Sequence, residues 1–311
     1  MKIIENNKIK ESLRKKASYL WIKATALSYE EVNILKDKFN LHPTTIEDIL
    51  TSQTRAKYEE FEEYTLFVLK GIKEVKQNSV ETYNISFIIG ENFLITINDN
   101  GNDIISEFAK NQKKVEHILK KGEDYITHYI IDKEIDKYLR IKTEFGEELK
   151  KIEREFIENQ SKEILKKIYS KELVFLELRQ LSESATDLCL NLTKPADNYI
   201  HNNLIPYFKD VYDHAFKTSE GYKLMLDRMN RMKDMYATIT SIKTNEIMRY
   251  LTIIMALMMP FTIITGFYGM NVNLPLQNHS YVYLFILGLM LFVGIVMILL
   301  IRKKGWTSEE N

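Results

Sequence analysis

The sequence has 311 residues, which is long enough for two domains, and its 43 basic side chains balance its 43 acidic ones. A chain without net charge has no overall field that attracts nucleic acid or an acidic surface, so no nucleic-acid partner is expected. The single cysteine, Cys189, excludes an intrachain disulfide and fits a reducing compartment.

Residues 1–103 are predicted to form a small cytosolic α/β domain. The polar N-terminus contains no apolar segment of the kind found in cleavable signal peptides. Residues 28–50 predict helical structure interrupted by Pro43, and the acidic run over residues 59–63 is better explained as a solvated edge than as a metal site. Strands are expected at four apolar or β-branched runs, residues 19–26, 64–72, 84–89 and 93–97.

Residues 104–206 form a charged region in which Lys and Glu alternate with Ile and Leu, a pattern that predicts long solvated helices. Two pairs of opposite charge stand four residues apart in the order that stabilises a helix, Glu147 with Lys151 and Glu158 with Lys162. A break is expected near Pro195 and Pro206.

Residues 207–249 contain no proline and a single glycine, and they lead directly into an apolar segment. We expect one helix from Tyr207 to about Phe267, which at ~1.5 Å per residue would be about 90 Å long. A helix of this length cannot bury its apolar stripe alone, so it is expected to be a stalk that packs against copies of itself or against the preceding helices.

Two transmembrane helices are predicted, over residues 250–268 and 281–301. No Asp, Glu, Lys or Arg occurs between Arg249 and Arg302. Each apolar run is close to the ~20 residues that a helix needs to cross ~30 Å of hydrocarbon. A buried helical hairpin in a soluble protein is the alternative, and it explains the exclusion of charge less well.

Basic residues flank this hairpin on one side only. They are Lys243 and Arg249 before the first span and Arg302, Lys303 and Lys304 after the second. The connecting loop, residues 269–280, carries only His279 as a titratable group. Cytoplasmic loops are enriched in basic residues, so both termini, including the basic segment 302–311, are expected in the cytoplasm and the loop outside.

Two helices packed together leave no lumen, so a chain with two spans can pass a polar solute only when several copies surround an axis. The first span carries a heptad-like seam of small, hydroxyl, amide and thioether side chains, namely Asn245, Met248, Thr252, Met255, Met259, Thr262, Gly266 and Gly269. Small residues also allow transmembrane helices to pack closely. The seam alone therefore leaves a pore lining and a packing face both open.

At the outer end of the first span stands Tyr268-Gly269-Met270-Asn271. A Gly-Met-Asn triplet in this setting, after a long charged helical region, resembles the CorA family of Mg2+ channels. Further stretches that match are Leu41-His42-Pro43, Glu47 to Leu50, Tyr207 to His214, Lys243 to Met248, Leu251 to Ile254, Met259-Pro260 and Arg302 to Trp306. The resemblance covers nearly the whole length.

The resemblance implies a fold class, a location and a set of partners. The fold would be an α+β cytosolic domain with long stalk helices and a two-helix transmembrane hairpin, assembled as a funnel-shaped homopentamer. The protein would be integral to the plasma (inner) membrane, and its partners would be copies of itself, the lipid bilayer and divalent cations. Mg2+ would be both cargo and regulator, and no organic cofactor is expected.

The resemblance also implies roles for the residues of the pore. Gly269, Met270 and Asn271 would form the selectivity filter, and Met248 and Leu251 would form a hydrophobic constriction. Mg2+ gives up its water reluctantly, so a ring of neutral amide oxygens could hold the hydrated ion without removing its shell. Arg302, Lys303 and Lys304 would form a basic ring at the base of the membrane.

An ungated pore would overload the cell, because each charge gains about 2.3 kcal/mol per 100 mV on entering a negative interior. By resemblance, Asp48 and Asp210 would meet across the subunit interface and bind regulatory Mg2+. Glu47 and Asp132 would form a second site nearby. Filled sites would hold the ring closed, and emptied sites would let like charges separate the subunits.

One segment departs from the family pattern. Many members follow the signature with Met-Pro-Glu-Leu, whereas this chain has Leu274-Pro275-Leu276-Gln277. An acidic ring at the mouth would raise the local concentration of cations. Its absence puts that mode of ion capture in doubt, and it leaves Asn273, Gln277, Asn278 and His279 as weak polar candidates.

Three competing interpretations remain open. A transporter of Zn2+, Co2+ or Ni2+ would favour His or Cys on the seam, where neither occurs, although the seam methionines are compatible with Co2+. A non-conducting membrane-anchored metal sensor or scaffold would need no amide or hydroxyl there. An enzyme is disfavoured, since no nucleophile and base pair, P-loop or zinc-binding spacing is found.

Overall fold

The computed structural model describes residues 2–5, 19–25, 27–51, 56–98, 103–111, 115, 118, 124–194, 199–272 and 281–304. The chain divides into two compact units, residues 1–232 and 233–311, and each is described by itself. The expected outer-loop segment Leu274 to Gln277 and its polar neighbours up to His279 lie outside the described residues, as do Pro195 and Trp306.

The first unit is built on a six-stranded sheet with the order β1-β2-β6-β5-β4-β3. Its strands are β1 (Lys2–Glu5), β2 (Leu20–Thr25), β3 (Lys57–Glu60), β4 (Thr65–Val75), β5 (Val80–Gly90) and β6 (Phe93–Asn98). β2 pairs in parallel with β1 and β6, and the other neighbours are antiparallel. The four expected strands are therefore found, and the acidic run begins on β3 at the edge of the sheet.

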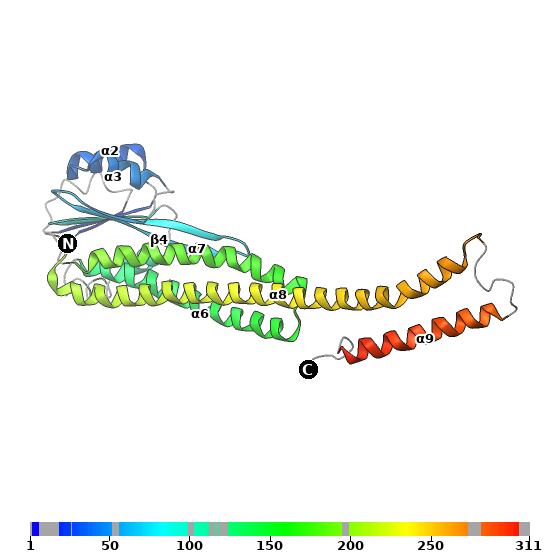
Figure 1. The fold of residues 1–311 in the computed structure, drawn as a ribbon. Helices are drawn as coiled ribbons and strands as arrows, with labels where there is room; N and C mark the ends of the chain where they lie inside the picture. The colour runs from blue at the N-terminus through cyan, green and yellow to red at the C-terminus, as the bar shows by residue number, and fades with distance from the viewer. Residues whose placement is uncertain are drawn as a thin grey trace. The chain divides into compact units, whose positions relative to one another are not determined.

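Helices cover both faces of this sheet (Figure 1). On one side lie α2 (Tyr29–Phe39) and α3 (Pro43–Leu50), and on the other lie α4 (Asp103–Lys110), α6 (Tyr125–Glu158), α7 (Lys162–Leu192) and the first part of α8 (Ile205–Tyr268), which follows the short η2 (Asn202–Leu204). Successive side chains of a strand point to opposite faces. Leu66 and Val68 accordingly belong to the core under α2 and α3, whereas Phe67 and Leu69 belong to the core under α6 and α7.

The boundary between α2 and α3 follows from local chemistry. Ser28 and Glu31 form a capping box at the start of α2, and Asn40 ends that helix in the left-handed region, at φ 49°. Pro43 then occupies the first turn of α3, where its missing N–H costs no hydrogen bond. Pro43 thus starts the second helix rather than bending a single one.

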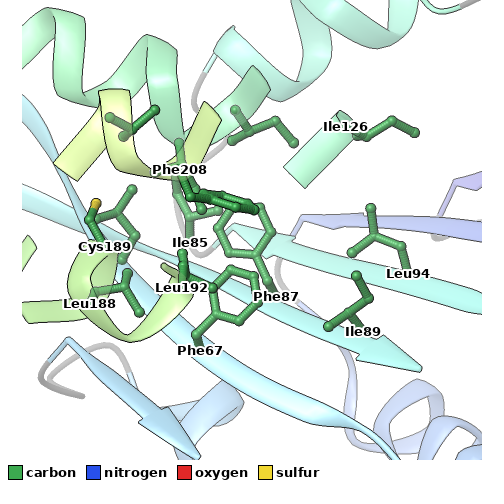
Figure 2. Close-up of a cluster of buried hydrophobic side chains, with 14 of the residues drawn as sticks. Phe67, Ile85, Phe87, Ile89, Leu94, Ile126, Leu188, Cys189, Leu192 and Phe208 are labelled. Carbon is green, nitrogen blue, oxygen red and sulfur yellow. The ribbon is translucent and has the colours of Figure 1, made fainter. Parts of the chain in front are cut away.

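The larger core joins α7 and α8 to the sheet (Figure 2). Phe67 and Phe87 stack with ring centroids 4.8 Å apart, and Phe208 of α8 is fully buried in the same cluster. Cys189 of α7 also lies in this core, and burial raises the pKa of its thiol to about 12. A thiol with such a pKa stays neutral at physiological pH, so Cys189 is a packing residue.

Charged side chains link the long helices of the first unit. Lys167 and Lys171 of α7 lie 2.7 Å and 2.8 Å from Glu155 and Glu148 of α6, respectively, and Arg228 of α8 pairs with Glu153 of α6. The two pairs expected from sequence spacing are not the ones observed. Glu147 contacts Lys150, at 2.7 Å, while α6 ends at Glu158 and α7 begins at Lys162, so the second pair spans a helix break.

The second unit contains the rest of α8 and α9 (Val282–Lys303). α8 is one helix from Ile205 to Tyr268 with Pro260 inside it, close to the expected span of Tyr207 to Phe267. Both helices are long and apolar enough to cross a membrane, and the most apolar window is 0% buried in α8 and 6% buried in α9. Apolar surface this extensive requires lipid or further protein to cover it.

Candidate functional site

The seam of the first span is exposed along α8. Met248, Met255 and Met259 are 55%, 52% and 63% exposed, and Asn245, Thr252, Thr262 and Gly266 are exposed as well. The half-buried residues of the same stretch recur at helical spacing on the opposite face, namely Ile253, Ala256, Leu257, Pro260, Phe261, Ile264 and Tyr268.

That opposite face is the one that approaches α9. A Cβ added to Gly294 of α9 would lie 3.1 Å from the ring of Phe261. The half-buried residues of α9 also recur at helical spacing, including Ile286, Met290 and Met297. The seam is therefore not a packing face for α9 within this unit, and it remains available to other copies or to a lumen.

The hydroxyl groups of the seam are oriented by the helix backbone. Thr252 Oγ1 donates to the carbonyl of Met248 at 2.8 Å, and Thr262 Oγ1 donates to the carbonyl of Met258 at 3.0 Å. A hydroxyl has one hydrogen and two lone pairs, so these groups have only acceptor capacity left for other partners. Acceptor oxygens suit cations and the water molecules around them.

The Gly-Met-Asn triplet begins directly after the last residue of α8. The N–H of Gly269 donates to the carbonyl of Thr265 at 2.9 Å, and that of Met270 to the carbonyl of Phe267 at 3.4 Å. A Cβ at position 269 would lie 2.9 Å from the Thr265 oxygen, so this close approach favours glycine. Asn271 follows as an exposed side chain.

The C-terminal end of α8 contributes a negative electrostatic potential beside the Gly-Met-Asn triplet. The last carbonyl groups of a helix have no intrahelical donors and carry the negative end of its dipole. Cations are favoured near such an end. Gly269 and Asn271 therefore stand where backbone oxygens and a side-chain amide can both face a cation.

The four expected regulatory acids do not meet within one chain. Glu47 and Asp48 lie on α3, over one face of the sheet, whereas Asp132 on α6 and Asp210 on α8 belong to elements that cover the other face. Asp48 forms an ion pair with Lys57 of β3, and Glu47 and Asp210 are exposed. A metal site that combines α3 with α6 or α8 would therefore need two chains.

Within its own chain, Asp132 lies beside two residues that sequence reasoning missed. Asp132, Asp136 and His214 each offer a possible ligand atom, and these atoms all lie within 4.8 Å of one another. Lys133 Nζ lies 2.5 Å from Asp136 and 3.6 Å from Asp132, and its hydrogen bond to Asp136 raises the pKa of Lys133. The spacing of four between the two aspartates was visible in the sequence, but the approach of His214 from α8 depends on tertiary packing.

The basic residues expected at the membrane base lie at the end of α9. Arg302 and Lys303 occupy its last turn, and Lys304 is its C-cap. Cations there complement the negative end of the helix dipole, so this placement also has a local stabilising effect.

Comparison with known proteins supports the fold and the family. The chain is 29% identical over 290 residues to the cobalt/magnesium transport protein CorA of Thermotoga maritima, covering 92% of this chain and 83% of that protein. It is 22% identical over 290 residues to the cobalt/magnesium transport protein CorA of Methanocaldococcus jannaschii, covering 92% and 91%. The complete structure of the CorA magnesium transporter from Methanocaldococcus jannaschii matches with a TM-score of 0.78 at 21% identity, over 94% of this chain and 92% of that one.

The family model described as CorA-like Mg2+ transporter protein matches residues 16–303, which is nearly the whole chain. The two apolar helices are those expected of a membrane transporter. This chain therefore belongs to the CorA-like family of divalent-cation membrane transporters.

Proposed function

We propose that this protein is a homo-oligomeric channel that admits hydrated Mg2+, with Co2+ as a second passenger, into the cytoplasm. The observation that supports this most strongly is the seam of α8. It is uncharged, exposed, directed away from α9, and it ends at the triplet Gly269 to Asn271. A helix that served only as an anchor would need no row of acceptor groups on that face.

The pore lies between copies of the chain. One α8 and one α9 enclose no lumen, so the seams of several α8 helices must surround a common axis. Five copies are proposed on the resemblance to the family. The seam methionines would give the lumen flexible apolar walls, while Thr252 and Thr262 would supply rings of acceptor oxygens.

The ion is held by neutral amide and hydroxyl oxygens rather than by charged carboxylates. Mg2+ prefers six oxygen ligands and keeps most of its water, and the amide of Asn271 can accept hydrogen bonds from that water. The seam contains no His or Cys, which disfavours a pathway specialised for Zn2+. Co2+ remains compatible with it, and the Thermotoga relative is named a cobalt/magnesium transport protein.

The membrane potential supplies the driving force. With both termini in the cytoplasm, a divalent ion that enters gains about 4.6 kcal/mol per 100 mV, which is twice the value for one charge. Mg2+ bound between Asp48 of one subunit and Asp210 of the next, with Glu47 and Asp132 nearby, would hold the ring closed. Met248 and Leu251 would then form the narrow apolar constriction that excludes water.

Ion flux into liposomes tests this proposal. Purified protein is reconstituted with an internal Mg2+ indicator, an inside-negative potential is imposed, and the wild type is compared with Asn271→Ala. We expect potential-driven uptake that the variant loses. Asn202→Ala, an exposed amide in the first unit, serves as the matched control and should retain uptake. Equal flux in wild type and Asn271→Ala, or no flux in either, would reject the filter assignment.

A further inference from the structure

We propose that a cleft beside α6 binds a nucleotide, with the phosphate on Lys137 and Arg140 and the base beside Phe145. We call it the Lys137–Arg140 cleft, because these two side chains line both of the cavities that form it. All of its residues belong to the first unit, so the site needs neither the pore nor a second chain.

The cleft consists of two cavities on α6 that share two basic side chains. One cavity, of about 330 Å³, is lined by Ile104 of α4 and by four side chains of α6, including Lys137 and Arg140. The other, of about 340 Å³, lies between β4 and α6 and has the same two bases and Phe145 in its wall. Cavities of at least ~300 Å³ are of the size that small-molecule ligands occupy.

The backbone fixes the face of α6 that carries the two bases. Lys137 and Arg140 are three residues apart, so they lie on the same face of the helix. The residue between them that anchors α6 to the sheet is Tyr138, whose hydroxyl donates to the carbonyl of Lys70 at 2.7 Å. The ammonium of Lys137 lies 5.7 Å from the centroid of the Tyr83 ring. Side chains on a helix held in this way are preorganised for a ligand.

Lys137 and Arg140 are the bases of the cleft whose charge is available. Lys133 pairs with Asp136 at 2.5 Å, and Lys73 of β4 lies 3.5 Å from a glutamate of β5. Lys137 and Arg140, in contrast, form no ion pair with any residue that the structure describes. A guanidinium binds two phosphate oxygens at once, and an ammonium adds a point charge, so this pair favours a phosphate group.

The second cavity also offers a surface for a flat ring. Phe145 is half-buried and lines it together with Ile72 and Val75 of β4 and Ile141 of α6. The ring of Phe145 is held by an edge contact with Phe175, with centroids 5.3 Å apart. Bases stack on aromatic side chains, whereas a bare phosphate or a sugar phosphate makes no use of such a surface.

Two carboxylates in the same cavity narrow the ligand class further. Glu74 and Glu144 line it, and their charge would repel a phosphate that came without other groups. Carboxylates accept hydrogen bonds, and the hydroxyls of a ribose and the amino group of a base donate them. A ligand that carries an anion at one end and donors at the other therefore fits the cleft better than inorganic phosphate does.

Calorimetric titration of the full-length protein in detergent, at constant Mg2+, tests this proposal. The probes are AMP, adenosine and inorganic phosphate; a single phosphate group takes up little of the Mg2+. We expect one AMP to bind per chain. Adenosine and phosphate should each bind at least about tenfold more weakly, because each lacks the part of the ligand that the other retains.

Variants on α6 locate the site. Arg140→Gln and Lys137→Gln should each weaken AMP binding at least about tenfold, since hydrogen bonds to charged groups are the stronger class. Phe145→Leu should weaken the binding of AMP and leave that of phosphate unchanged. Arg154→Gln is the matched control, because Arg154 is exposed on the same helix and lines neither cavity, and it should bind AMP as the wild type does.

Three results would overturn the proposal. They are no AMP binding to the wild type, wild-type affinity for AMP in Arg140→Gln or Lys137→Gln, and binding of inorganic phosphate as tight as that of AMP. The flux assay with Asn271→Ala contains no nucleotide and bears only on the pore, so failure of one proposal leaves the other standing.

Discussion

Gly269 shows how one residue can determine the geometry of the proposed filter. It is the first residue after α8, and its own N–H is bonded to the carbonyl of Thr265. The position where a side chain would start is already close to that carbonyl oxygen. The direction in which Asn271 leaves the helix therefore depends on the absence of a Cβ two residues earlier.

Replacing Gly269 by alanine should reduce Mg2+ flux in the liposome assay. Its Cβ would lie 2.9 Å from the Thr265 oxygen, and overpacking of this kind costs about 1–3 kcal/mol, which corresponds to roughly a 5- to 150-fold shift of a conformational equilibrium. Gly288→Ala in α9 is the matched control, since beyond its chain neighbours and the adjacent backbone of its own helix no atom of the described residues lies within 4 Å of its Cβ position. Similar flux in both variants would show that position 269 does not shape the filter.

Among individual residues, the candidates that sequence reasoning singled out are those that local spacing makes visible. The triplet Gly269 to Asn271 and the seam could be found because one helix displays them at regular spacing. The proximity of Asp136 and His214 could not be predicted from the sequence, because it depends on how α6 packs on α8. The pairing of Asp48 with Lys57 was missed for the same reason, since it joins a helix to an edge strand.

At the scale of elements, a contact between β5 and α6 depends on a glycine of the neighbouring strand β4. A Cβ at Gly71 of β4 would collide with the ring of Tyr83, the tyrosine opposite it on β5. The hydroxyl of Tyr83 donates to Glu134, which is fully buried on α6. The glycine thus makes room for the ring that connects the sheet to this helix.

Gly71→Ala should destabilise the first unit by about 2–4 kcal/mol, because the tyrosine ring must move and its hydrogen bond to Glu134 would be broken. Gly221→Ala in α8 offers the contrast. Its new methyl group would meet only the flexible end of Lys142, and alanine favours a helix by about 1 kcal/mol. Chemical denaturation, followed by the fluorescence of Trp21, measures the free energy of unfolding of both variants. A decrease in Gly71→Ala no larger than in Gly221→Ala would show that Gly71 is not needed to make room for the Tyr83 ring.

Elements with strong local signals were predicted from the sequence, and elements that depend on pairing were not. β2, β4, β5 and β6 are apolar runs, and α8 was expected within two residues of its observed start. β1 and β3 have only four residues each. β3 reads Lys-Tyr-Glu-Glu and has no apolar pattern, and β1 reads Lys-Ile-Ile-Glu, in which two apolar residues are too few to indicate a strand. Such short edge strands form because a neighbouring strand offers its hydrogen bonds.

At the scale of the whole molecule, the uncovered apolar surface is the main constraint. α8 and α9 of the second unit contact each other along one face and leave their remaining apolar side chains exposed. Lipid can cover Phe, Leu and Ile, but it provides no partner for the acceptor oxygens of Thr252 and Thr262. Those groups are best accommodated where the seams of several copies line a water-filled lumen.

The sequence could predict a membrane protein, because the hydrocarbon of a bilayer requires two apolar runs of this length to be free of charged residues. The sequence could not predict which face of α8 is covered by α9, since small and thioether residues suit either a lumen or a packing face. The structure shows α9 on the other face, and this leaves the association of copies as the deciding question.

Native mass measurement of the full-length protein in mild detergent addresses that question most directly. A pore built from seams requires at least three copies, and we expect a single dominant assembly of five. Observation of only single chains or pairs would contradict it, because no closed ring of α8 helices could then exist.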